Sequence, residues 1–136
     1  MLRQIRVDGY RSLTDFKLEI KPGLNILVGP NGSGKTNIVS FFEFLSYMIE
    51  GALSDAVFKS GGVSAVFQRV PSDCIIPPIK IEIQGQTRRK SPFRSERNSD
   101  RGLYYEYSCK IKISEEESYI YYAGQTLKIA YLNAAG

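Results

Sequence analysis

The sequence has no histidine and no tryptophan among its 136 residues. The absence of histidine excludes His-ligated zinc, Ser-His-Asp triads and histidine-based nuclease chemistry from this chain. Only two cysteines are present, Cys74 and Cys109, and they form no CxxC pair. Neither a zinc site nor a disulfide framework is indicated, and two reduced thiols fit a reducing compartment. Any hydrolysis must therefore rely on other groups.

Long hydrophobic runs are missing as well. No stretch approaches the roughly eighteen consecutive apolar residues that a membrane span requires, and the charged start of the chain lacks the apolar region of a signal peptide. Hydrophobic residues make up 43% and charged residues 24%, as in ordinary globular domains. We therefore expect a cytoplasmic protein without membrane contact, folded as one domain over residues 1–136. Its formal net charge of +4 favours anionic partners but does not choose among nucleotide, nucleic acid and lipid.

The periodicity of apolar residues predicts an α/β chain. The run 24–28 is nearly continuously apolar, which is typical of a buried strand. Further strands are predicted at 2–7 and 16–20 as a hairpin, from near 79 to 83, at 103–113 and at 119–123, with a last apolar stretch at 127–132. Helices are predicted after residue 34, ending at Gly51, and at 52–60. The apolar face of the first helix is expected to consist of Ile38, Phe41, Phe42, Leu45, Met48 and Ile49.

Two polar segments separate these elements. Residues 86–102 contain six Lys or Arg residues against two acidic ones, which predicts an exposed basic loop. The acidic residues Glu115, Glu116 and Glu117 lie in a polar run that we interpret as a solvated hairpin tip.

Residues 29–36 match the pattern G-x-x-x-x-G-K-[ST] at every fixed position, with a predicted strand before them and an amphipathic helix after them. Glycines allow positive φ, so that consecutive N–H groups can turn inward as an anion nest. The helix that follows presents free N–H groups and its positive dipole end to the same phosphates. Lys35 would contact the β- and γ-phosphates, and the Thr36 hydroxyl would bind Mg²⁺. The alternative is a tight strand-to-helix turn without a ligand.

Residues 1 to about 51 resemble the opening of SMC/RecF-like ABC ATPases, in particular the RecF-like and OLD-type "AAA family" ATPases of bacterial DNA repair and phage defence. The resemblance rests on an N-terminal strand, Gly-Tyr-Arg-Ser-Leu at 9–13, a Phe-x-Leu-x-Ile strand, and the segment 23–37. It implies the N-terminal lobe of an ABC-type P-loop NTPase, with a mixed sheet and antiparallel hairpins around the P-loop helix, and with ATP and Mg²⁺ as ligands.

The resemblance also assigns roles to single residues. Asn31 is expected near the γ-phosphate, and Asn37 beside the nucleotide at the start of the helix. Arg11, and with it Ser12, is expected to approach the nucleotide from the first hairpin, although a solvated turn is an equal alternative for Arg11. The set implied to bind the cofactor is Asn31, Gly32, Ser33, Gly34, Lys35, Thr36, Asn37 and Arg11.

Several motifs that this family uses for hydrolysis are absent from the sequence. There is no Walker B strand ending in Asp-Glu, no LSGGQ-like signature and no switch histidine, so no catalytic residue is identified. Gln84, Gln86 and Gln125 are equivalent candidates for the Q-loop. The sequence therefore predicts an incomplete lobe, which gains ATPase activity only with a C-terminal lobe or partner chain.

Three functions remain open at this point. The first is the nucleotide-binding half of an ATPase that dimerises around ATP and couples closure to DNA transactions. The second is a nucleic-acid-binding module that uses the basic loop at 88–101. The third is a P-loop kinase, which the run of β hairpins after the first helix disfavours.

Overall fold

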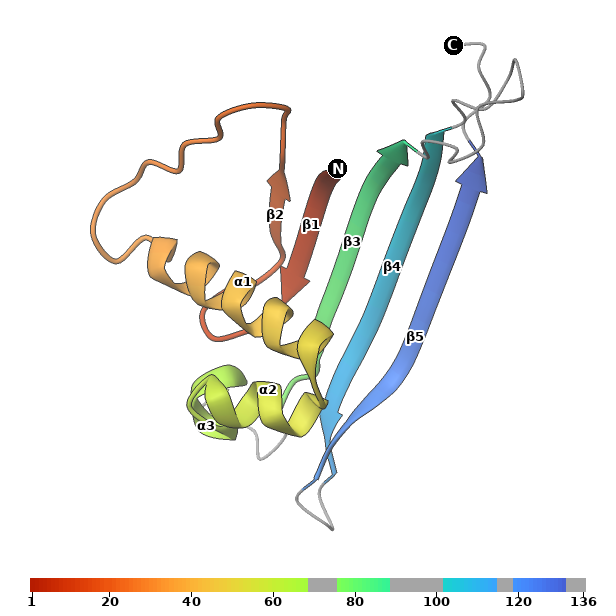
Figure 1. The fold of residues 1–136 in the computed structure, drawn as a ribbon. Coiled ribbons are helices and arrows are strands. Elements are labelled where there is room, and N and C mark those ends of the chain that lie inside the picture. Colours follow the sequence, from red (N-terminus) through yellow and green to blue (C-terminus); the bar gives the residue numbers. More distant parts are fainter. Residues whose placement is uncertain (69–75, 89–101, 115–118, 132–136) are drawn as a thin grey trace, which may run out of the picture.

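The computed structural model describes residues 1–68, 76–88, 102–114 and 119–131. Within them the chain forms one sheet in the order β2-β1-β3-β4-β5, and all of its strand pairs are antiparallel. Figure 1 shows the helices gathered on one face of this sheet. The elements are, in chain order, β1 (Leu2–Asp8), β2 (Phe16–Glu19), α1 (Lys35–Glu50), α2 (Leu53–Lys59), α3 (Val63–Val66), β3 (Ile79–Arg88), β4 (Gly102–Ile113) and β5 (Ile120–Tyr131). The α/β class is therefore confirmed.

The first hairpin follows the predicted alternation. Ile5 and Val7 of β1 are buried toward the helices, and they lie opposite Leu18 and Phe16 of β2. β1 also pairs with β3, so residues about 75 positions apart in sequence become neighbours in the centre of the sheet.

Gly9 ends β1 in a backbone conformation that other residues rarely adopt. Its φ is +82°, and a Cβ at this position would lie 2.6 Å from the carbonyl oxygen of Pro78. The chain can therefore turn out of β1 against the start of β3 only because residue 9 has no side chain.

The last two strands form a long hairpin with one irregularity. Cys109 and Ile111 of β4 are buried on the helix side, as the alternation predicts. β5 is one continuous strand, although the sequence predicted a break at Gly124. Its register shifts there: Lys110 lies opposite Gly124 and Ile111 lies opposite Tyr122, so Ala123 is an extra residue, a β-bulge.

The strand predicted at 24–28 is wrong. The structure assigns no strand to this segment, and Figure 1 shows it in the long connection that arches between β2 and α1. Leu24 and Val28 are 86% and 90% exposed. An apolar run becomes a buried strand only where another element covers it, and no described element pairs with this one.

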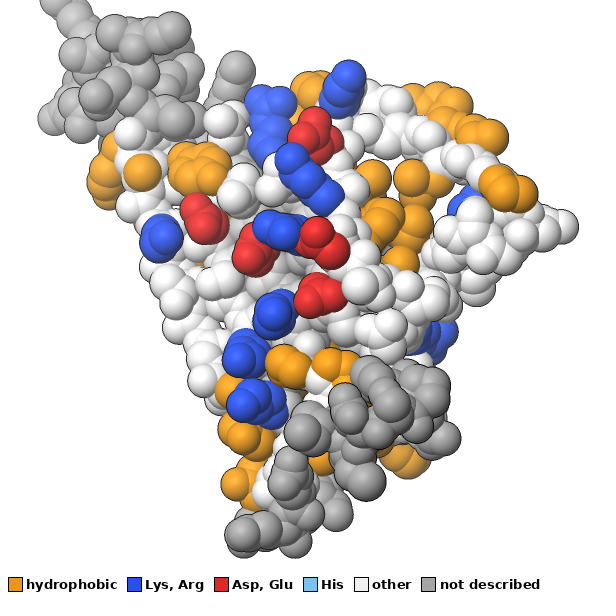
Figure 2. Space-filling model, turned by 180° about the vertical axis from the view of Figure 1, so that it is seen from behind, with side chains coloured by type: hydrophobic (Ala, Val, Ile, Leu, Met, Phe, Trp, Pro, Cys, Tyr) orange, Lys and Arg blue, Asp and Glu red, His pale blue; other side chains and the backbone are white. Residues whose placement is uncertain are grey.

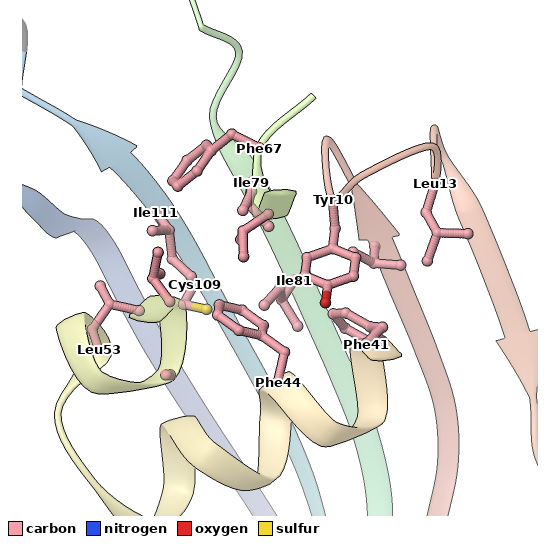
Figure 3. Packing of buried hydrophobic residues seen from close by; sticks show 14 of the residues in the cluster. Tyr10, Leu13, Phe41, Phe44, Leu53, Phe67, Ile79, Ile81, Cys109 and Ile111 are labelled. Carbon is pink, nitrogen blue, oxygen red and sulfur yellow. The ribbon is translucent and has the colours of Figure 1, made fainter. Parts of the chain in front are cut away.

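Helix α1 begins at Lys35 and ends before Gly51, as predicted. Its buried residues are Ile38, Phe41 and Phe44. The predicted face missed Phe44 and included Phe42 and Ile49, which are 37% and 83% exposed. The true face is therefore rotated toward Phe44, and Figure 3 shows this ring directed at the centre of the sheet.

The core lies between the helices and the sheet (Figure 3). Tyr10 is fully buried there, and its ring lies 5.3 Å from those of Phe41 and Phe44. On the sheet side of this core, Ile79 and Ile81 of β3 are also fully buried. This apolar packing holds α1 against the middle strands.

Several predictions concern segments at the margins of the described residues. Gln86 and Thr87 belong to β3, and Gly102 belongs to β4. The predicted basic loop is therefore shorter than 86–102, and its remaining residues, 89–101, lie outside the described part, as do Glu115, Glu116 and Glu117. Among the described residues, no helix is long and apolar enough to cross a membrane.

Candidate nucleotide-binding loop

The loop 29–36 leads directly into α1 through two glycines with positive φ. Gly32 has a φ of +82°, and Gly34 has a φ of +90° in the left-handed region as the N-cap residue of α1. A Cβ at Gly34 would touch Leu13, whereas Gly32 faces open space. Both glycines give the loop a curvature that side-chain-bearing residues resist.

At the N-terminus of α1, no side chain takes the place that a bound anion would occupy. No side chain caps it, and its first turn contains no acidic residue. Because the first N–H groups of a helix have no partner within the helix, they and the helix dipole favour a negative group here. The Ile38 N–H is the first to close onto the helix, at 3.0 Å from the Gly34 carbonyl oxygen.

Lys35 is folded back over its own loop. Its Nζ donates hydrogen bonds to the carbonyl oxygens of Gly29, at 2.5 Å, and Pro30, at 2.6 Å, and lies 3.3 Å from Ser33 Oγ. The ammonium thus lies inside the curve of the loop, within reach of a phosphate held there. Its partners are carbonyl and hydroxyl oxygens, which a phosphate oxygen can replace.

The turn at 9–13 supports the start of α1. Asn37 Nδ2 donates to Ser12 Oγ at 2.5 Å, and the buried Tyr10 hydroxyl donates to the Ser40 carbonyl oxygen at 3.0 Å. Burial raises the pKa of Tyr10, so this donor keeps its proton at neutral pH. The sequence drew attention to Ser12 and Asn37, but it gave no role to Tyr10. The only signal was an aromatic residue in a short polar turn.

Arg11 lies in the same turn, but its guanidinium group contacts a different element, helix α2. Its φ is +49°, and its Nη2 donates to the Ser60 carbonyl oxygen, at the end of α2, at 3.0 Å. The guanidinium also stacks on Tyr10, 5.5 Å from the ring centroid. Its Nε is buried without a hydrogen-bond partner among the described groups. The structure therefore brings Ser12 and Asn37 together, while the recorded side-chain contacts of Arg11 are with Ser60 and Tyr10.

Metal-binding groups are sparse in the described residues. They contain no group of three or more Cys, Asp or Glu side chains that could hold a metal ion. Thr36 is exposed next to the open end of α1, and its hydroxyl can supply one oxygen ligand.

Comparison with known proteins identifies the family of this chain. The family model described as "AAA ATPase domain" matches residues 1–123. The DNA replication and repair protein RecF of Corynebacterium jeikeium is 43% identical over 44 residues, which are 32% of this chain and 10% of RecF.

Two other relatives match in the same way. The DNA double-strand break repair Rad50 ATPase of Methanopyrus kandleri is 38% identical over 70 residues, 52% of this chain and 8% of its own. The chromosome partition protein Smc of Desulfitobacterium hafniense is 50% identical over 45 residues, 32% of this chain and 4% of its own. The chain thus spans a tenth or less of the length of these relatives. Since the family match covers most of the sequence, the chain belongs to the AAA ATPase domain family and corresponds to the N-terminal region of SMC/RecF-like ABC-type ATPases.

Proposed function

We propose that residues 29–36 bind the triphosphate of ATP together with Mg²⁺. The observation that supports this most directly is the uncapped N-terminus of α1, preceded by two glycines in left-handed conformations and followed by Lys35 and Thr36. A loop that served only as a turn would not need an ammonium inside its curve. With ATP present, we expect Lys35 to exchange its carbonyl partners for the β- and γ-phosphates.

The other residues of the proposed site would contact the nucleotide or its Mg²⁺ ion. Asn37 is already oriented by Ser12, and Arg11 would have to release the Ser60 carbonyl to reach the nucleotide. Mg²⁺, when bound, would neutralise charge on the phosphates, with Thr36 as its ligand from this chain. The backbone N–H groups that would face the phosphates belong to Asn31, Gly32, Ser33, Gly34, Lys35 and Thr36.

We further propose that the chain is one incomplete nucleotide-binding lobe over 1–136, and that it works in an ATPase whose ATP-dependent closure acts on DNA in repair or phage defence. The relatives RecF, Rad50 and Smc are proteins of DNA repair and chromosome partition. The exposed apolar surface supports completion by a second lobe. In addition to the exposed apolar run at 24–28, the outer side of α1 carries Val39 and Ile49, whose exposed fractions are 57% and 83%. Large exposed apolar areas mark interaction surfaces.

An apolar groove of about 570 Å³ between α1 and the sheet points to the same completion. It is lined by Phe42 and Met48 of α1 and by Tyr105 and Tyr107 of β4. We propose that a C-terminal lobe, from this chain's own continuation or from a partner chain in a homodimer, covers this surface and supplies the groups for hydrolysis. The isolated chain should therefore show negligible ATPase activity, and robust turnover by pure protein would refute this part of the proposal.

Titration of the ¹⁵N-labelled chain with Mg-ATP tests the binding site. Amide signals of residues 29–37 should shift, and Lys35→Ala should abolish the shifts while the other signals stay in place. Among the described residues, the side-chain hydrogen bonds of Lys35 all lie within its own loop, so its loss should leave the fold intact. Hydrogen bonds to charged groups contribute about 1.5–3 kcal/mol each, or roughly 10- to 150-fold in affinity per bond.

A matched control for this experiment is Lys17→Ala. Lys17 lies in β2, 51% exposed and 2.9 Å from Glu19, so its removal changes the net charge equally without touching the loop. Unchanged ATP affinity in Lys35→Ala, or equal losses in both variants, would contradict the assignment.

A further inference from the structure

The face of the sheet opposite the helices has a cluster of lysines. Lys80 of β3 lies directly opposite Lys110 of β4, and Lys112 follows two residues along β4 on the same face. Like charges directly opposite in a sheet disfavour the pairing. A cross-strand lysine pair is therefore an arrangement that an anionic partner would relieve. We name Lys80, Lys110 and Lys112 the lysine cluster.

The remaining charges on this face are mostly paired. Arg6 lies 2.6 Å from Asp15, Lys17 lies 2.9 Å from Glu19, and Lys128 lies 3.9 Å from Glu106. Figure 2 shows this face, with basic and acidic side chains side by side in its upper part and basic ones below.

Two of the three lysines of the cluster differ from these. Lys80 is paired as Lys128 is, at 3.8 Å from Asp8, which lies opposite it on β1. In the described part of the chain, neither Lys110 nor Lys112 forms an ion pair.

A hollow of about 330 Å³ adjoins Lys80 and Lys110. Gly124 lies opposite Lys110 across the bulge and has no side chain to fill the space. The hydroxyl-bearing residues Ser108 and Thr126 line the same hollow. Ammonium and hydroxyl groups are donors that suit phosphate oxygens, and Glu82 is the one acidic residue among the described residues of the lining.

Two exposed tyrosines continue this surface toward the end of the hairpin. Tyr121 lies opposite Lys112, and its ring is 5.5 Å from that of Tyr119. Tyr119 and Tyr121 are 49% and 37% exposed. Aromatic rings beside a basic track are the combination with which proteins hold single-stranded nucleic acid, since bases stack on the rings while the backbone follows the charges.

We propose that the lysine cluster, with Tyr119 and Tyr121, is a binding surface for single-stranded DNA. Duplex DNA offers phosphates to lysines, but its bases are not free to stack on exposed rings, so the tyrosines favour a single strand. The surface lies on the opposite face of the sheet from α1, so its residues are separate from those of the proposed nucleotide site.

Salt dependence of binding tests the lysines. Fluorescence anisotropy with a short labelled oligothymidylate should give a log–log slope near −2 if three lysines neutralise three phosphates, at about −0.7 per contact on single strands. Affinity should then fall roughly twentyfold between about 50 and 200 mM salt. The variant Lys110→Gln/Lys112→Gln should reduce the slope by about 1.4. The acidic run at 115–117 is left unchanged in every variant.

The control removes two lysines that are already paired. Lys17→Gln/Lys128→Gln lowers the net charge equally on the same face, and it should leave the slope unchanged. Equal effects of the two double variants would overturn the proposal, because binding would then follow net charge alone.

Stacking is tested separately at Tyr121. Tyr121→Ala should weaken oligothymidylate binding at least about fivefold, the lower limit for loss of one stacked base, without changing the salt slope. Tyr121→Phe keeps the ring and should bind like the parent, which separates stacking from a folding defect. Equal affinity for duplex and single strand, or binding to anionic vesicles without oligonucleotide binding, would overturn the proposal. Mg-ATP shifts at 29–37 should persist in the lysine variant, so failure here and failure of the nucleotide site are distinguishable.

Discussion

Two glycines with the same φ provide a test of how this fold uses missing side chains. Gly9 and Gly32 both have a φ of +82°, but a Cβ at Gly9 would lie 2.6 Å from the Pro78 carbonyl oxygen, whereas a Cβ at Gly32 would meet nothing within 4 Å. Gly9→Ala should therefore cost the conformational penalty and the clash, and Gly32→Ala only the penalty. The position of the Cβ is fixed by the backbone of residue 9, and the atom it meets is a backbone oxygen of Pro78. No side-chain rotation can therefore relieve the clash.

The magnitudes can be worked out from these two terms. The left-handed conformation costs a residue with a Cβ roughly 1–2 kcal/mol, and the loss of unfolded-state freedom returns about 0.4–1 kcal/mol at both positions. Forcing a group into packed space costs about 1–3 kcal/mol more. Because the first two terms are shared, Gly9→Ala should be less stable than Gly32→Ala by about 1–3 kcal/mol, a large fraction of the roughly 5–15 kcal/mol that stabilises a domain.

Urea denaturation followed by circular dichroism measures this difference directly. Since both variants replace hydrogen by methyl at the same φ, they should show equal m-values and different midpoints. Equal midpoints, or a lower midpoint for Gly32→Ala, would refute the reasoning that the approach of Pro78 requires glycine at position 9.

Three further predictions concern the core and its tyrosines. Tyr10→Phe removes the hydrogen bond to Ser40 and should cost about 0.5–1.5 kcal/mol of unfolding free energy; an unchanged urea midpoint would show that the bond contributes nothing. Phe44→Ala should cost about 3–5 kcal/mol, and a cost equal to that of Phe42→Ala, the 37% exposed neighbour, would contradict the assigned helix face. Burial raises the pKa of Tyr107 to about 12, whereas the unfolded chain gives tyrosine a pKa of about 10. Between these two pH values the unfolded state loses the phenol proton first, so the free energy of unfolding should fall as pH rises from about 10 to about 12. Urea midpoints of the parent should fall more steeply over that range than those of Tyr107→Phe, and parallel curves would contradict the assignment.

A strand was predictable where its apolar and polar residues alternate without interruption, as they do in β4. The period of two at 103–113 correctly placed Cys109 and Ile111 on the buried face. In β5 the alternation changes phase at the bulge, which made one strand look like two. A phase change of this kind cannot be distinguished from a turn without knowing the partner strand.

The run at 24–28 failed as a prediction for a different reason. Apolar composition indicates that a segment can be buried, but not that the covering element is at hand. The start of α1 and the positive φ of Gly32 and Gly34 were predictable because they depend on local backbone geometry. The contact of Arg11 with Ser60 depends on how α2 packs, which no local pattern reports.

The extra residue in β5 has a consequence for changes in chain length. Ala123 is the residue without a counterpart on β4. Its deletion would straighten the ladder and leave Tyr121 and Tyr122 on the faces they now occupy. Loss of any one residue between 125 and 131 would instead move the residues on one side of the deletion to the opposite face of the sheet. A change of one residue in the length of this hairpin should therefore disturb the ladder least at position 123.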